Sequence, residues 1–128
     1  MLVRIKNNQA ILNAPFGSIL LTFADGDLIK CELSEAAVEE DLGSFVGHKA
    51  VKALQSYLKG DIHVLDSWKP SEDGTEFRRR VWKEIAKVRA GDTVTYGQIA
   101  DSLDSSPRAV GSACGDNPLP IFVGCHRV

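Results

Sequence analysis

The chain contains few of the residues that define several common protein classes. Its 128 residues include three cysteines, one methionine and 7% aromatic residues. Three scattered cysteines cannot build a disulfide framework, so we expect free thiols in a reducing compartment, the cytoplasm, or the nucleus of a eukaryote. No apolar run approaches the roughly eighteen residues of a membrane span. The first residues also lack the apolar core of a secretory signal, so no membrane partner is expected.

The remaining composition is that of an ordinary globular chain. Hydrophobic residues make up 44%, charged residues 25%, and the formal net charge is -2. The chain can bury a core as one domain or as two small ones. No exposed apolar stripe stands out, which favours a monomer. A basic cluster interrupts the even charge pattern, with only Glu84 opposing it: Arg78, Arg79, Arg80, Lys83, Lys87 and Arg89. Such a cluster can meet phosphates, but a solvated helix face is the simpler interpretation.

The first half predicts a small antiparallel sheet followed by a helix. Strands are expected near 10–12 and over 19–23 and 28–33, with Asp25-Gly26 as a tight hairpin turn. A helix is expected over 50–58 and a less secure one over 34–41. The stretch 69–74 has the composition of a linker. We therefore predict an α+β chain with an N-terminal domain over 1–72 and a second domain over 73–128.

The second half predicts three helices. Thr75 is a candidate N-cap for a helix whose apolar residues repeat at helical spacing: Phe77, Val81, Trp82, Ile85 and Val88. Thr95 and Gln98 fit a capping box for a short helix. After a turn at 104–106, Ser106 and Pro107 can begin another helix that runs to about Cys114. Two short helices joined by a tight turn outline a helix-turn-helix, although most such pairs are packing units.

The second helix of this pair carries unusually small side chains. Ala109, Gly111, Ser112 and Ala113 would let its backbone approach another surface closely. Entry into a narrow minor groove requires such an approach, whereas a helix that reads the major groove usually carries long polar side chains. Arg108, at the start of the helix, is the one long cation positioned to reach inward.

Cys125 and His126 form the candidate catalytic pair. A thiol reacts as its thiolate, and an imidazole is the usual neighbour that removes the proton. Adjacent residues of an extended segment point to opposite faces, so a water bridge or a turn is needed. A buried cysteine beside a surface histidine is the simpler interpretation of the dipeptide. Cys31 and Cys114 are interpreted as packing residues, and the spacing of cysteines and histidines predicts no metal site.

The run from Thr75 to Val128 resembles the methylated-DNA–protein-cysteine methyltransferases, also called O6-alkylguanine-DNA alkyltransferases. The matching motifs occur in order with family-like spacing: TEFRRRVW at 75–82, GDTVTYGQIA at 91–100, RAVG at 108–111, NP at 117–118 and CHRV at 125–128. Residues before about 70 match only in general shape. The resemblance implies a ribonuclease H-like N-terminal sheet with a helix and a winged-helix-like C-terminal domain.

The same resemblance implies a single-use repair reaction on double-stranded DNA, without a cofactor. The helix-turn-helix enters the minor groove and the O6-alkylguanine is rotated out of the duplex. Arg108 matches the residue that fills the vacated space, and Tyr96 matches the tyrosine that helps turn the phosphate. Asn117 matches the hinge that ties the recognition helix to the reactive segment. Cys125 matches the alkyl acceptor, and His126 matches the base that activates it through water.

Two departures from the family pattern bear on this expectation. Gly124 stands where the family normally has a proline, which leaves the backbone before Cys125 less restricted. The sequence also ends at Val128, before the family's glycine-rich loop and a glutamate that orients the histidine. A carboxylate at Val128 is expected to raise the pKa of Cys125. The alternatives are a non-catalytic protein that binds alkylated DNA and an inactive truncated fragment.

Overall fold

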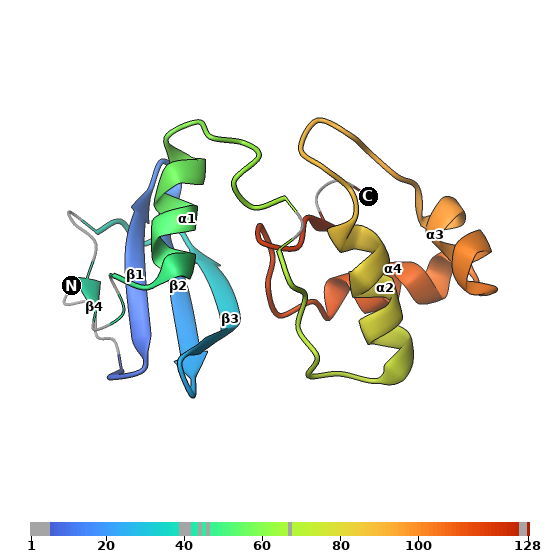
Figure 1. Ribbon diagram of the computed structural model, residues 1–128, viewed down its shortest axis with the longest axis horizontal. Helices are drawn as coiled ribbons and strands as arrows, with labels where there is room; N and C mark the ends of the chain where they lie inside the picture. Colours follow the sequence, from blue (N-terminus) through green and yellow to red (C-terminus); the bar gives the residue numbers. More distant parts are fainter. Residues whose placement is uncertain (1–5, 39–41, 44, 46, 67, 126–127) are drawn as a thin grey trace. The chain divides into compact units, whose positions relative to one another are not determined.

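The computed structural model describes residues 6–38, 42–43, 45, 47–66, 68–125 and 128 (Figure 1). The chain divides into two compact units, Met1–Val64 and Leu65–Val128. They are called the N-terminal and C-terminal units below, and each is described by itself. The arrangement of a sheet with one helix followed by a helical unit confirms the predicted α+β class.

The N-terminal unit contains an antiparallel sheet with the strand order β3-β2-β1-β4. Its strands are β1 (Gln9–Ala14), β2 (Gly17–Ala24), β3 (Asp27–Ser34) and the two-residue β4 (Leu42–Gly43). The turn between β2 and β3 has positive φ at both central residues, 52° at Asp25 and 80° at Gly26. Positive φ at both central residues is the mark of a type I′ turn, which matches the twist of the two paired strands. The predicted Asp-Gly hairpin is therefore confirmed.

Helix α1 (Lys49–Leu58) supplies the helical layer of this unit, beside the sheet in Figure 1. His48 caps it, because its Nδ1 accepts from the Ala50 backbone N–H at 3.0 Å and its Nε2 lies 2.7 Å from the Gly26 carbonyl oxygen. The buried stripe of the helix includes Val51 and Leu54, as the spacing predicts. The expected helix over 34–41 is wrong where the structure describes it, because Ser34 is the last residue of β3 and no helix follows over 35–38.

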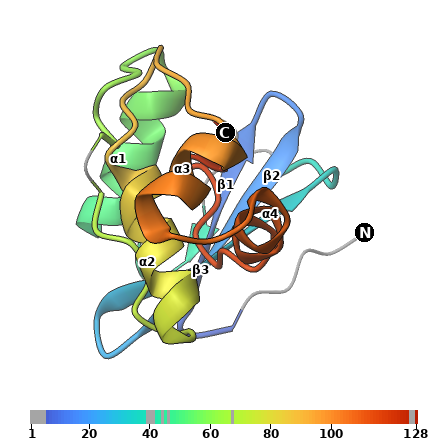
Figure 2. The ribbon, with the colours of Figure 1, turned by 90° about the vertical axis from the view of Figure 1, so that its right-hand side faces the viewer.

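The described part of the C-terminal unit contains three helices: α2 (Glu76–Ala86), α3 (Tyr96–Leu103) and α4 (Pro107–Gly115), shown from a second side in Figure 2. Thr75, Thr95 and Ser106 cap them, and the Thr95–Gln98 capping box is present. All three predicted helix starts are confirmed. No strand occurs among the described residues of this unit. None of the helices that the structure describes is long and apolar enough to cross a membrane.

The unit boundary lies between 64 and 65, earlier than the predicted boundary between 72 and 73. Leu65 is 1% exposed, and the Asp66 carboxylate accepts from the Ala90 backbone N–H at 3.0 Å. The Trp68 ring packs on Phe122 with centroids 4.9 Å apart. The segment before α2 is therefore anchored in the C-terminal unit, although its composition is that of a linker.

Candidate functional site

Cys125 lies at the end of an irregular segment that follows α4, and Asn117 holds that segment in place. The Asn117 Nδ2 donates to the Val123 carbonyl oxygen at 3.0 Å and lies 3.3 Å from the Cys125 Sγ. Its Oδ1 accepts from the Leu119 backbone N–H at 3.1 Å. One side chain thus joins the end of α4 to the residues that carry the thiol. Two of the predicted catalytic residues, Asn117 and Cys125, are in direct contact.

The surroundings of the Cys125 sulfur favour its ionised form. The pKa of Cys125 is lowered, first by a hydrogen bond with the Cys114 side chain and also by the Asn117 amide, while partial burial acts in the opposite direction. The thiol is only partly buried and is not in a disulfide. The expected effect of a carboxylate at Val128 on this pKa stays a prediction. A lowered pKa and partial exposure are the properties of a nucleophilic cysteine.

The other two thiols have the opposite character. Burial, followed by the neighbouring Glu32 carboxylate, raises the pKa of Cys31 to about 12. The pKa of Cys114 is raised as well, first by its hydrogen bond with Cys125 and then by burial. Both side chains are less than a tenth exposed, at 4% and 8%. Cys125 is therefore the thiol best suited to act as a nucleophile.

The backbone before Cys125 is tightly folded. Ile121 has a φ of 73°, a region in which a β-branched residue is strained. The Val123 N–H donates to the Leu119 carbonyl at 2.9 Å, and the Cys125 N–H donates to the Val123 carbonyl at 2.8 Å. The second bond spans a tight turn centred on Gly124, which is buried. These bonds, with those of Asn117, hold the strained segment against the end of α4.

Helix α4 contacts the core through one face and leaves another open. Val110, Ala113 and Cys114 are buried, and the Ala113 carbonyl accepts from the Trp82 indole N–H at 2.9 Å. Ala113 is only 3% exposed, and its predicted contact with DNA stays a prediction.

Tyr96 and Gly111 lie against each other, where α3 meets α4. A Cβ added at Gly111 would lie 3.4 Å from the Tyr96 Cε2, so the absence of a side chain leaves room for the ring. Tyr96 remains 42% exposed. The first residue of α3 and the middle of α4 therefore form one surface, in which an aromatic ring lies over the helix backbone.

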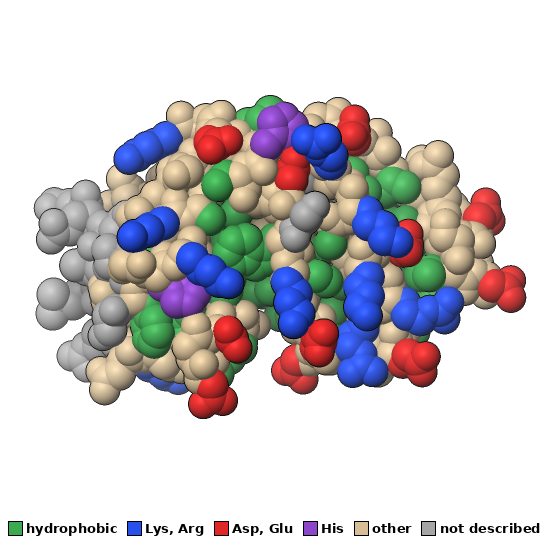
Figure 3. Space-filling model, in the orientation of Figure 1, with side chains coloured by type: hydrophobic (Ala, Val, Ile, Leu, Met, Phe, Trp, Pro, Cys, Tyr) green, Lys and Arg blue, Asp and Glu red, His purple; other side chains and the backbone are tan. Residues whose placement is uncertain are grey.

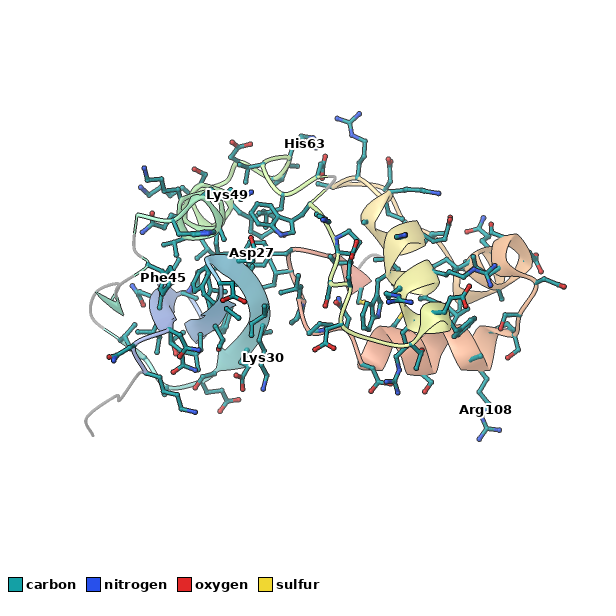
Figure 4. The ribbon with its side chains drawn as sticks, turned by 60° about the horizontal axis from the view of Figure 1, so that its bottom comes forward. Asp27, Lys30, Phe45, Lys49, His63 and Arg108 are labelled. Atoms are coloured by element: carbon teal, nitrogen blue, oxygen red, sulfur yellow. The ribbon has the colours of Figure 1, made fainter. Side chains whose placement is uncertain are left out.

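The start of α4 adds a cation to this side of the unit. The Arg108 side chain is exposed and extends away from the helix in Figure 4, and Ser112 is exposed as well. Ala109 is partly exposed. Together, the open residues of α3 and α4 make a surface, the α3–α4 face, whose members are Tyr96, Arg108, Ala109, Gly111 and Ser112.

Half of the cations in the basic cluster around α2 are paired with carboxylates. Figure 3 shows Lys and Arg side chains gathered over α2. Arg78 pairs with Asp116 at 2.8 Å, Lys87 with Glu84 at 2.9 Å, and Arg89 with Asp66 at 3.4 Å. Three of its six cations thus have carboxylate partners within the protein. The interpretation as a solvated helix face fits this pattern better than a dedicated phosphate site.

Two further predictions concern His126 and metal ligands. His126 lies outside the described residues, so its predicted role stays a prediction. Among the residues that the structure describes, no group of three or more His, Cys, Asp or Glu side chains could hold a metal ion. The sequence interpretation missed the contact with Cys114, whose backbone carbonyl accepts from the Cys125 thiol at 3.5 Å. The helical spacing of Cys114 indicated burial but not its neighbour across eleven residues.

Known proteins resemble this chain in sequence. Residues 76–128 match the family described as 6-O-methylguanine DNA methyltransferase, DNA binding domain. A methylated-DNA–protein-cysteine methyltransferase of Metallosphaera sedula is 38% identical over 117 residues, which cover 90% of this chain and 74% of the relative. The corresponding Mycobacterium tuberculosis protein is 35% identical over 126 residues, covering 91% and 74%.

Solved structures agree with these sequence matches. The crystal structure of Mycobacterium tuberculosis O6-methylguanine methyltransferase has a TM-score of 0.71 at 33% identity, and the match covers 92% of this chain and 75% of that one. A crystal structure of Mycobacterium tuberculosis OGT in complex with DNA has a TM-score of 0.68 at 32% identity, with the same coverage of 92% and 75%. The chain spans about three quarters of the length of these proteins.

Proposed function

Because the chain belongs to the methylated-DNA–protein-cysteine methyltransferase family, we propose that it repairs O6-alkylguanine in DNA by moving the alkyl group to Cys125. The observation that carries this assignment is the Cys125 sulfur, which is partly exposed and lies 3.3 Å from the Asn117 amide. Its pKa is lowered, so more of it is thiolate at neutral pH. Neither of the other two cysteines combines these properties.

The proposed step is a displacement at saturated carbon. The Cys125 thiolate attacks the alkyl carbon, a carbon–sulfur bond forms, and the bond from that carbon to the guanine O6 breaks. The guanine leaves with the electron pair and takes up a proton. His126 is proposed as the group that removes the proton from the Cys125 thiol beforehand. The thioether product is stable, so each protein molecule acts once.

The α3–α4 face is proposed to bind double-stranded DNA through the minor groove. Its small residues, Ala109, Gly111 and Ser112, permit close approach of the helix backbone. Arg108 is proposed to enter the base stack after the alkylated guanine rotates out, and Tyr96 to contact the turned phosphate. Exposure of Arg108 and Tyr96 supports this proposal, as does the likeness to OGT, whose structure in complex with DNA is known.

Transfer of a labelled methyl group tests the proposed reaction. A duplex that carries one O6-[³H]methylguanine is mixed with the protein, and protein-bound label is counted over time. We expect label to rise to one equivalent per active protein and then stop. Cys125→Ser should abolish transfer, whereas Cys31→Ser, a change at a buried thiol in the other unit, should leave it intact. Lesion binding without any transfer by the unaltered protein would contradict the proposal.

Binding by variants tests the proposed DNA interface. Arg108→Ala should lower the preference for duplex that contains O6-methylguanine over undamaged duplex, because the cation no longer occupies the stack. Arg80→Ala removes the same charge from an exposed position on α2 and serves as the matched control. Loss of a positive charge alone would weaken binding to the damaged and the undamaged duplex by the same factor. That factor would be the same in the two variants. Equal effects of the two variants would therefore contradict the assigned role of Arg108.

A further inference from the structure

Helix α2 holds the last turn of α4 at two points. The Trp82 indole N–H donates to the Ala113 carbonyl oxygen at 2.9 Å, and Trp82 is only 1% exposed. One turn earlier on α2, the Arg78 guanidinium pairs with the Asp116 carboxylate at 2.8 Å. Residues four apart lie on the same face of a helix, so both contacts come from one side of α2. A buried hydrogen bond and a partly exposed ion pair thus fix the end of α4.

The same turn carries the groups that meet the Cys125 sulfur. The Cys114 carbonyl oxygen accepts from the Cys125 thiol at 3.5 Å and from the Asn117 backbone N–H at 3.2 Å. The Asn117 side-chain amide lies 3.3 Å from the sulfur. Cys114 directly follows Ala113, and Asn117 directly follows Asp116. Each contact that α2 makes with this turn is therefore one residue before a contact with the thiol.

The ion pair has a particular effect at this end of α4. Asp116 is the C-cap of the helix, where the partial negative charge of the last carbonyl groups repels a carboxylate. The Arg78 cation offsets this repulsion. Without it, an uncompensated carboxylate would stand directly before Asn117. The two side chains are 43% and 45% exposed, so the pair contributes little to the stability of the fold, and its effect is expected on the placement of Asn117.

We propose that Arg78 is a positioning residue, whose ion pair with the end of α4 keeps the Asn117 amide against the Cys125 sulfur for alkyl transfer. The inference rests on the proposed function in that it takes Cys125 as the acceptor. Arg78 acts through Asp116 and not on the reacting atoms. The Trp82 indole still anchors the preceding residues when the ion pair is lost, so α4 itself should stay folded.

The pH profile of Cys125 alkylation by iodoacetamide tests the proposal in the full chain without DNA. Modified peptides are quantified by mass spectrometry, so the signal of Cys125 is separated from those of the other cysteines. Arg78→Gln removes the cation but keeps a long polar side chain, while Arg78→Lys keeps the cation. A displaced Asn117 amide stabilises the thiolate less, so we expect Arg78→Gln to raise the midpoint by about 0.3–0.5 pH unit. Arg78→Lys should keep the midpoint of the unaltered protein.

A second substitution separates positioning from a direct effect of charge. Loss of a nearby cation raises the pKa of a thiol whether or not any group moves. Asp116→Asn removes the partner through which Arg78 is proposed to act. In its presence, Arg78→Gln should add no measurable rise, whereas a direct effect of the charge would give the same rise with or without Asp116. The other charged side chains of the three helices are the same in every variant: Glu76, Arg79, Arg80, Lys83, Glu84, Asp101 and Arg108.

Hydrogen exchange measured by NMR locates the change in structure. The backbone N–H of Asn117 is bonded to the Cys114 carbonyl, and that of Leu119 is bonded to the Asn117 Oδ1. In Arg78→Gln, these two N–H groups should exchange about two- to threefold faster, while those in the middle of α2 and α3 should exchange as in the unaltered protein. A general loss of stability would instead speed exchange throughout the unit. Thermal unfolding of each variant verifies that it is folded.

Three results would overturn the inference. An unchanged midpoint in Arg78→Gln, or unchanged exchange at Asn117 and Leu119, would show that the ion pair does not position the amide. An equal rise with and without Asp116→Asn would show that Arg78 acts through its charge alone. Equal rises in Arg78→Gln and Arg78→Lys would show that the ion pair is not the cause. Failure of methyl transfer from DNA by the unaltered protein, with the predicted pH profiles intact, would instead overturn the proposed function and leave the role of Arg78 standing.

Discussion

The side-chain amide of Asn117 donates to the Cys125 sulfur across eight residues of chain, at 3.3 Å. The same Nδ2 also bonds the Val123 carbonyl, and the Oδ1 holds the Leu119 N–H. Asn117 therefore performs two tasks at once. It fixes the path of the segment that leads to the thiol, and it places a hydrogen-bond donor against the sulfur.

Substitutions at Asn117 separate these two tasks. Asn117→Ala removes both and should lower the free energy of unfolding by about 1–3 kcal/mol, because it leaves buried backbone groups unpaired. Asn117→Asp keeps an acceptor for Leu119 but replaces the donor with a carboxylate, so it should raise the pKa of Cys125 more than the Ala variant does. Thermal unfolding and the pH profile of thiol alkylation measure the two effects. A Cys125 midpoint in the Asp variant equal to that of the unaltered protein would contradict this role.

The three thiols should react with different pH dependence. Alkylation requires the thiolate, so a lowered pKa brings reactivity to lower pH and a raised pKa delays it. Cys125 should have a midpoint below ~8.5, the value of an ordinary cysteine. Cys31, whose pKa is raised to about 12, and Cys114 should stay protonated and slow at pH 7–8. Limited labelling of the folded protein with iodoacetamide, followed by peptide mapping, reports each site. Labelling of Cys31 as fast as Cys125 would be incompatible with these assignments.

The contact between Tyr96 and Gly111 predicts a graded response to side chains at position 111. In Gly111→Ala, a Cβ at 3.4 Å from the ring offsets the gain in helix propensity of about 0.5–1 kcal/mol, so stability should change little. The larger side chain of Gly111→Leu must displace the Tyr96 ring and would block close contact between DNA and the backbone of α4. Its affinity for duplex with O6-methylguanine should fall by roughly tenfold, the equivalent of about 1.4 kcal/mol. Fluorescence anisotropy measures this affinity, and a Leu variant that binds as tightly as the Ala variant would refute the assigned interface.

A proline at position 124 should suit the turn before the thiol. The Cys125 N–H bonds the Val123 carbonyl around Gly124, and Gly124 is not among the residues with positive φ. Proline fixes φ near the value that such a turn uses. Gly124→Pro should therefore raise the free energy of unfolding by about 0.4–1 kcal/mol through the unfolded state. Denaturant unfolding checks this, with Gly124→Ala as the control for the added Cβ. Destabilisation by Pro but not by Ala would mean that the turn has another geometry.

Local signals in the sequence were sufficient for the helix ends and the hairpin. Thr75, Thr95 and Ser106 each accept a hydrogen bond from a backbone N–H three residues later, so each cap is a local contact. The turn at Asp25-Gly26 likewise depends on the positive φ values of these two residues. The expected helix over 34–41 failed over its described residues because β3 extends to Ser34 and no helix follows over 35–38. Weak propensity alone does not decide such a segment.

The candidate site was harder to predict, because its contacts join distant positions. The resemblance to a known family pointed to Asn117, Cys125 and Arg108 as site residues. No pattern in the chain places Cys114 beside Cys125. Burial of Ala113 was equally hidden, since its small size fits both a helix that approaches DNA and a helix that packs in a core. The indole of Trp82, thirty-one residues earlier, donates to the Ala113 carbonyl oxygen, a contact that no pattern in the sequence indicates.

Peptide mapping after exposure to alkylated DNA tests the central claim most directly. The protein is incubated with an excess of duplex that contains O6-methylguanine, its intact mass is measured, and the modified peptide is sequenced. We predict one added methyl group per chain, located on Cys125, with Cys31 and Cys114 unmodified. A methyl group on either of those two thiols, or an unchanged mass in a protein that binds the duplex, would contradict the account.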